Sequence, residues 1–177
     1  MFINRLRIKF FWVIGCAFVL PLSALVSDNT LPIKVSSESA SLDLKQGVAM
    51  YSGHVKVVQG NRLLQGDTLT IQRGSDGQIY SFVAMGHPAT TQDLPNIGSS
   101  IVHGQAQMIY YYPGRALVEY VNQAHFDQGG NIFEGDLITY NLNTQVVSSP
   151  KTARDQRVTT IILPAYNQQK QNKESHS

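Results

Sequence analysis

The chain has 177 residues, with 14 Lys and Arg against 12 Asp and Glu and a single cysteine. The formal charge of +2 is small and the basic residues are not clustered, which argues against a nucleic-acid-binding protein, because such a protein needs a concentrated basic face. The length suits one domain with a substantial apolar core.

The first residues have the three parts of a secretory signal peptide. Arg5, Arg7 and Lys9 give a basic start, an apolar run follows from Phe10 to Leu20, and small residues come next. The run is short for a membrane anchor, which needs about 20 apolar residues, so we predict cleavage. The predicted signal peptide is 1–24, with 27 as the alternative end. Its removal leaves 11 basic and 12 acidic residues and no cysteine.

The body of the chain consists of short segments in which apolar and polar residues alternate, separated by glycines. These segments are rich in Val, Ile, Thr and Tyr, which favours strands; they are 54–58, 67–71, 78–85, 106–112, 116–121, 136–140 and 157–163. Only 37–46 is a candidate for a short helix. Many short strands with glycine-containing turns are typical of an all-β sandwich or jelly roll. We predict one such domain over 28–164 and a disordered polar tail over 165–177.

The alternation also predicts which side chains face the interior. Lys56 marks the outward face of its strand, and the threonines of 67–71 mark that of the next. The predicted inward residues are Val55, Val57, Leu69, Ile71, Ile138 and Tyr140, together with Met108, Tyr110 and Tyr112. For the last three, a shift of one residue would exchange the two faces and turn Ile109 inward.

An internal repeat runs through the domain. QGDTLTI at 65–71 returns as EGDLITY at 134–140, and the same offset of 69 residues takes Tyr51 to Tyr120. It also places Asn122 where the first copy has Gly53. The repeat predicts one β unit used twice.

The repeated Gly-Asp pair predicts a turn before each strand. Gly66 and Gly135 would adopt the turn geometry, and Asp67 and Asp136 would accept hydrogen bonds from the local backbone. The two aspartates could also be imagined as the carboxylate pair of a glycosidase. Their equivalence in a repeat favours the turn role, which explains both at once.

The remaining chemistry of the sequence is sparse. His54, His87, His103 and His125 are scattered near turns without metal-ligand spacing, and we expect them to be exposed or hydrogen-bonded. Neither a nucleophile motif nor a phosphate-binding glycine loop is present. We therefore predict a protein that is not an enzyme and needs no cofactor or metal.

Five blocks of the sequence, taken in order, match a known pattern. They are LPIKVSSESASLDLKQGVAMYSGHVKVVQG from Leu31, GHPAT from Gly86, GQAQMIYYY from Gly104, FEGDLITYN from Phe133 and RVTTIILP from Arg157. Together they resemble the periplasmic lipopolysaccharide-transport proteins of the OstA/LptA family, over essentially the whole domain.

The resemblance implies a twisted, V-shaped β jelly roll, open along one side, that stacks head to tail with further copies. It implies a periplasmic protein that binds lipopolysaccharide and carries it from the inner-membrane transporter, through its tethered component, to the outer-membrane translocon. The lipid A acyl chains would lie in a groove lined by Ile33, Val55, Val57, Leu69, Ile71, Met108, Tyr110, Tyr112, Phe126, Ile138 and Tyr140. The stacking edges would hold Ile33, Val35, Val158, Thr160 and Ile162. The alternative is a scaffold of the same pathway that binds partners without carrying lipid.

Overall fold

The computed structural model describes residues 31–95, 98–151 and 157–164. The predicted signal peptide and the predicted polar tail lie outside these residues and stay predictions. Within the described ranges, no helix is long and apolar enough to cross a membrane.

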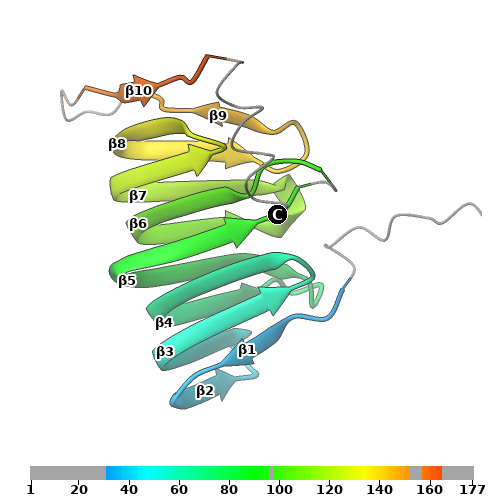
Figure 1. Ribbon diagram of the computed structural model, residues 1–177. Coiled ribbons are helices and arrows are strands. Elements are labelled where there is room, and N and C mark those ends of the chain that lie inside the picture. The colour runs from blue at the N-terminus through cyan, green and yellow to red at the C-terminus, as the bar shows by residue number, and fades with distance from the viewer. Residues whose placement is uncertain (1–30, 96–97, 152–156, 165–177) are drawn as a thin grey trace, which may run out of the picture.

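The described chain folds into one open antiparallel sheet of ten strands (Figure 1). The strands are β1 (Lys34–Ser36), β2 (Ser39–Asp43), β3 (Val48–Gln59), β4 (Arg62–Arg73), β5 (Ile79–Asp93), β6 (Val102–Tyr112), β7 (Leu117–Gln128), β8 (Asn131–Asn141), β9 (Val146–Ser148) and β10 (Thr159–Ile161). A 3-10 turn, Pro113–Arg115, joins β6 to β7. The all-β prediction is confirmed. The candidate helix 37–46 is wrong, because residues 39–43 pair with β3 as a strand.

The pairing order is β1-β3-β4-β5-β6-β7-β8-β10, with β2 also paired to β3 and β9 also paired to β8. Each end of the sheet is therefore covered by two short strands that share one long neighbour. At the first end, β2 pairs with residues 48–52 of β3 and β1 with residues 56–58. At the last end, β9 pairs with residues 139–141 of β8 and β10 with residues 132–134.

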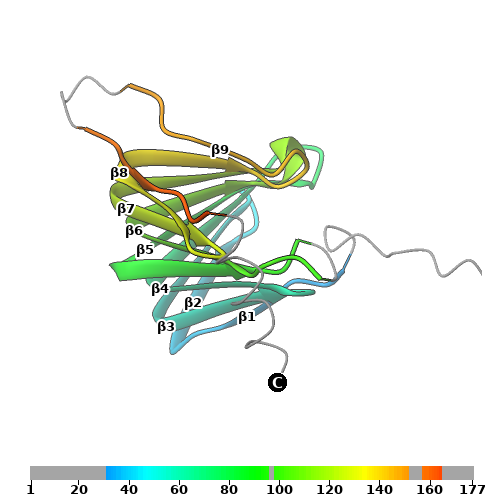
Figure 2. The ribbon, with the colours of Figure 1, turned by 45° about the horizontal axis from the view of Figure 1, so that its top comes forward.

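The long strands all change register near their middles. The shifts fall between residues 52 and 55 of β3, 65 and 68 of β4, 85 and 89 of β5, 105 and 108 of β6, and 121 and 124 of β7. Such irregularities are β-bulges, which bend a strand and increase its local twist. Because the bulges of neighbouring strands lie side by side, they form one fold line across the sheet (Figure 2).

The fold line divides the sheet into two leaves. Leaf A contains β2, β9 and residues 48–52, 68–73, 79–85, 108–112, 117–121 and 137–141. Leaf B contains β1, β10 and residues 55–59, 62–66, 89–93, 102–106, 124–128 and 131–135. One hydrophobic cluster unites buried side chains from both leaves, so the leaves face one another across a common interior.

The two copies of the repeat bend in the same way at the fold line. In β3, Gly53 and His54 have φ values of 81° and 45°, and the repeat partners in β7, Asn122 and Gln123, have 64° and 53°. These values lie in the left-handed region, which glycine adopts freely and asparagine adopts more readily than most other residues. Asn122, which stands in the second copy where the first has Gly53, therefore allows the same bend.

The Gly-Asp pair of the repeat lies inside strands, so the prediction of a turn is wrong. Gly66 and Asp67 are in β4, and Gly135 and Asp136 are in β8, at the fold line. A Cβ on Gly66 would stand 2.7 Å from the carbonyl oxygen of Met85, so this glycine allows a close backbone approach. A bulge and a turn use the same small and flexible residues, which is why the local signal does not separate them.

Asp67 has a different partner from the one expected. Its Oδ2 lies 2.8 Å from Nδ1 of His87 in the neighbouring strand β5, and both side chains are exposed. The carboxylate thus contacts an imidazole of the neighbouring strand along the fold line.

Most of the predicted inward residues are buried in the common interior. Val55, Val57, Leu69, Ile71, Phe126, Ile138 and Tyr140 all belong to the core cluster, and Ile33 and Val35 pack against it. Period-two alternation therefore predicts the interior correctly for six residues: Val55, Val57, Leu69, Ile71, Ile138 and Tyr140.

The inward prediction for Met108, Tyr110 and Tyr112 is wrong. Ile109 is fully buried and Tyr111 packs on the core, so the other three side chains lie on the outer face. The physical reason is the bulge of β6, which follows Val102 and Ala106 and shifts the alternation by one residue.

On that outer face the three residues form a cluster of their own. The Tyr110 hydroxyl donates to Sδ of Met108, the rings of Tyr110 and Tyr112 stack with centroids 6.3 Å apart, and the guanidinium of Arg115 lies 4.1 Å from the Tyr112 centroid. Tyr80, which is 67% exposed, meets the edge of Tyr112.

Candidate functional site

The interior between the leaves is the candidate site, because it gathers the large buried side chains of both. Phe126 of leaf B connects them: its ring centroid lies 5.0 Å from that of Tyr140 and 6.2 Å from that of Tyr120, both in leaf A. Aromatic pairs at such distances contribute about 0.5–1.5 kcal/mol beyond the apolar area that they bury. The leaves are thus held together by side-chain packing across an apolar layer.

A small cavity lies between the leaves, on the side away from the fold line. Its volume is about 60 Å³, and its lining includes Val57 and Val102 from leaf B and Phe82, Val118 and Tyr140 from leaf A. Pockets that bind small molecules usually measure about 300–1,000 Å³. In this structure, therefore, the middle of the interior is packed.

A larger hollow opens at the end of the sheet formed by β1 and β2. It measures about 680 Å³, and its apolar lining includes Val35, Leu42, Tyr51 and Ile71. Ile33 lines both this hollow and the small cavity, so the two share a wall.

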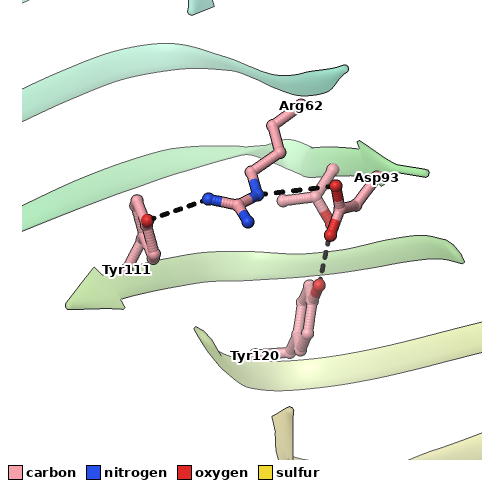
Figure 3. Close-up of polar contacts among 5 residues, drawn as sticks. Arg62, Asp93, Tyr111 and Tyr120 are labelled. Atoms are coloured by element: carbon pink, nitrogen blue, oxygen red, sulfur yellow. Dashed lines mark hydrogen bonds and ion pairs between the residues drawn. The ribbon is translucent and has the colours of Figure 1, made fainter. Parts of the chain in front are cut away.

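A polar cluster crosses the interior beside the small cavity (Figure 3). Nε of Arg62 lies 3.4 Å from Oδ1 of Asp93, and Nη1 of Arg62 donates to the hydroxyl of Tyr111 at 3.3 Å. Oγ1 of Thr91 and the hydroxyl of Tyr120 are 2.8 Å apart. Arg62, Thr91 and Asp93 belong to leaf B and the two tyrosines to leaf A, so both hydrogen bonds join the leaves.

A polar cluster in the interior was not predicted from the sequence. One signal was available: Arg62 stands two residues before Leu64, so period-two alternation turns it to the same face. A charged residue next to a turn normally points to solvent, and only its closeness to Asp93 from another strand makes an inward position tolerable.

Burial sets the protonation of the interior tyrosines. It raises the pKa of Tyr140 to about 12, and the nearby carboxylate of Asp93 adds to the rise. Burial also raises the pKa of Tyr120, against the lowering effect of its hydrogen bond with Thr91. Both hydroxyls therefore keep their protons at neutral pH and can donate hydrogen bonds.

The two ends of the sheet expose apolar side chains next to unpaired strand edges. Leu44 is 83% exposed beside β2, and Ile162 is 74% exposed just after β10. Val158 and Ile161 are also exposed at this last end, and Val146 of β9 lies there too. Edge strands of this kind offer free N–H and C=O groups to a further strand.

The histidines do not gather into a site. His54, His87 and His125 each contact a carboxylate, those of Glu38, Asp67 and Glu134, at 2.6, 2.8 and 3.1 Å. His103 is exposed. The predicted hydrogen-bonded or exposed state of the four histidines is confirmed. Over the ranges that the structure describes, no three potential metal ligands come together.

Comparison with known protein families gives one match over most of the domain. Residues 34–146 match the family model described as LptA/(LptD N-terminal domain) LPS transport protein.

Individual proteins similar to the chain carry related names. A lipopolysaccharide export system protein, LptH of Pseudomonas aeruginosa, is 35% identical over 147 residues, which are 80% of this chain and 84% of the relative. LptA of Escherichia coli, with the same descriptive name, is 29% identical over 155 residues, or 87% of this chain and 83% of the relative.

A solved structure is similar in fold as well as in sequence. The crystal structure of LptH of Pseudomonas aeruginosa, described as the LptA-homologous periplasmic component of the lipopolysaccharide transport device, superimposes with a TM-score of 0.73. The two are 33% identical, and the match covers 78% of this chain and all of that one.

Proposed function

Because the chain belongs to the LptA/(LptD N-terminal domain) family of LPS transport proteins, as its sequence blocks predicted, we propose that it carries lipopolysaccharide across the periplasm. It binds the lipid and passes it from the inner-membrane transporter to the outer-membrane translocon. The role is transport by binding, in which no covalent bond of the lipid changes.

The observation that carries this proposal is the apolar interior between two leaves, open at the β1 and β2 end through a hollow of about 680 Å³. An acyl chain that leaves water gains about 0.8 kcal/mol for each CH₂ group that it buries. A lipid with several chains therefore needs a continuous apolar surface for its whole passage. The interior side chains of this fold supply such a surface.

The groove is lined by Ile33, Val55, Val57, Leu69, Ile71, Ile109, Tyr111, Phe126, Ile138 and Tyr140. Met108, Tyr110 and Tyr112 are excluded from it, because they lie on the outer face of leaf A. The packed middle of the interior must widen to admit a chain, and the lipid then replaces the contacts that the leaves make with each other.

The exposed ends provide the continuity between molecules. We propose that β1 of one copy, with Val35 in the strand and Ile33 just before it, pairs head to tail with β10 of another, with Thr160 in the strand and Val158 and Ile162 on either side of it. Such an association does not close on itself and makes a stack whose grooves join. The same ends would meet the membrane-tethered component at one side and the translocon at the other.

Site-specific photo-crosslinking in living cells tests the proposal. The aromatic crosslinking residue p-benzoyl-phenylalanine replaces Phe126, which faces the groove, or Tyr110, a matched aromatic position on the outer face. We expect a lipopolysaccharide adduct at position 126 and none at position 110.

Two results would contradict lipid carriage within the groove. Equal adducts at both positions would show contact with lipid without a groove. Adducts at neither position, together with protein adducts from the ends of the sheet at Val35 or Ile162, would favour a scaffold that binds partners only.

A further inference from the structure

The groove has a polar feature that apolar burial of acyl chains does not explain. Arg62 begins β4, Asp93 ends β5, and Tyr111 and Tyr140 lie within the last two residues of β6 and β8. All four positions are strand ends remote from the fold line. The polar cluster therefore lies at the mouth of the groove, where the apolar interior meets the outside.

The hydroxyl of Tyr140, in this same region, lacks a hydrogen-bond partner within the described part of the protein. The residue is 1% exposed. The ring lines the small cavity, together with Arg62, Thr91 and Tyr120. A buried hydroxyl without a partner costs about 1–3 kcal/mol, so its presence calls for a role.

The charge around this hydroxyl decides what it can bind. Asp93 and Arg62 are the charged groups close enough to affect its pKa, and burial with Asp93 keeps the hydroxyl protonated. A protonated phenol in this position offers a hydrogen-bond donor, which a carbonyl oxygen can accept without bringing a further charge into the interior. The guanidinium of Arg62 is already paired with Asp93 and bonded to Tyr111, so an anion here would meet the Asp93 carboxylate without a cation of its own.

We infer that the Tyr140 hydroxyl is a polar subsite for the lipid, an inference that rests on the proposed function. The hydroxyl donates a hydrogen bond to the carbonyl oxygen that links an acyl chain of the lipid to its saccharide. An ester or amide carbonyl is the first acceptor that a saccharolipid presents above its hydrocarbon. With the chains in the groove, this linkage lies at the mouth. The subsite thus fixes how deep the lipid sits and favours acyl-linked lipids over plain hydrocarbon.

The variant Tyr140→Phe removes only the oxygen and keeps the ring that packs on Phe126. Two readouts move differently if the inference holds. The melting temperature of the lipid-free protein stays the same or rises, because an unpaired buried hydroxyl is removed. The affinity for purified lipopolysaccharide falls about threefold to tenfold, which is the effect of one lost hydrogen bond.

Tyr110→Phe is the matched control, since it removes the same oxygen from the outer face, where the hydroxyl contacts Met108. We expect unchanged affinity. A second arm repeats the Tyr140→Phe measurement with dephosphorylated lipopolysaccharide, and the loss of affinity persists if the acceptor is an acyl carbonyl. A loss that disappears on dephosphorylation would assign the contact to phosphate and overturn the inference.

Other results also overturn it. Unchanged affinity of Tyr140→Phe would show that the hydroxyl does not meet the lipid. A lowered melting temperature would show that the hydroxyl is satisfied within the protein. If the unmodified protein does not bind lipopolysaccharide, both the proposed function and the subsite are wrong. If it binds and Tyr140→Phe binds equally well, only the subsite is wrong.

Discussion

Replacing Phe126 by alanine tests the packing that joins the two leaves. The ring is fully buried and contacts Tyr120 and Tyr140 of leaf A and Phe133 of leaf B, with centroid distances of 6.2, 5.0 and 6.3 Å. Truncation of a buried phenylalanine to alanine costs about 3–5 kcal/mol, from lost transfer free energy and from the cavity that remains. Three lost aromatic contacts place Phe126→Ala toward the upper part of this range.

Thermal unfolding followed by circular dichroism measures the effect. For a domain of this size we expect Phe126→Ala to lower the melting temperature by about 10–20 °C. Tyr80→Ala is the control, because Tyr80 is 67% exposed on the outer face and its one aromatic contact, with Tyr112, limits the expected loss of stability to about 1.5 kcal/mol. A drop for Phe126→Ala no larger than that for Tyr80→Ala would refute the conclusion that this ring packs the leaves together.

Two further predictions concern the fold line and the buried tyrosines. Gly66→Ala should destabilise the domain by about 1–3 kcal/mol, because the added Cβ would stand 2.7 Å from a backbone oxygen. The repeat-equivalent Gly135→Ala should be nearly neutral, since its Cβ meets nothing closer than 3.4 Å. Urea unfolding compares the two variants, and equal losses of stability would contradict the steric argument. Burial raises the pKa values of both Tyr140 and Tyr120, so the folded state holds these protons more tightly than the unfolded state does. For Tyr140 the resulting contribution to stability is complete below about pH 10 and is lost as the pH rises through about 12. Tyr140→Phe should weaken that alkaline loss in urea titrations, and an identical pH profile would argue against the shift at Tyr140.

The sequence was a good guide to the interior wherever a strand runs without interruption. Val55, Val57, Leu69 and Ile71 were predicted inward from their alternation with Lys56 and the threonines, and all four are buried. The alternation is reliable there because each of these pairs lies on one side of a bulge.

The errors concentrate at the fold line. In β6 the segment 106–112 crosses a bulge, so an alternation counted through it assigns the wrong face to Met108, Tyr110 and Tyr112. The Gly-Asp pair was taken for a turn for a related reason, since a bend within a strand and a reversal between strands use similar residues. Which one occurs depends on the neighbouring strand, and a single sequence does not contain that information.

The polar cluster was missed for a different reason. Arg62, Thr91 and Tyr120 come from three strands and two leaves, and their contacts exist only once the sheet has folded on itself. By contrast, the repeat carried usable information: residues 53 and 54 and their partners 122 and 123 share a left-handed bend despite the exchange of glycine for asparagine.

A packed interior and a lipid-carrying groove are compatible because of how the leaves are joined. Within each leaf the strands are held by continuous backbone ladders, which end at the bulges of the fold line. Between the leaves, the contacts described above are made by side chains: the aromatic contacts of Phe126, the cluster of Arg62 and its partners, and apolar packing. Widening the groove therefore breaks side-chain contacts and leaves the ladders intact. Bound acyl chains replace the apolar contacts between the leaves, and polar groups at the acyl linkage can replace part of the hydrogen bonds between them. Lipid binding therefore largely offsets the free energy needed to open the groove.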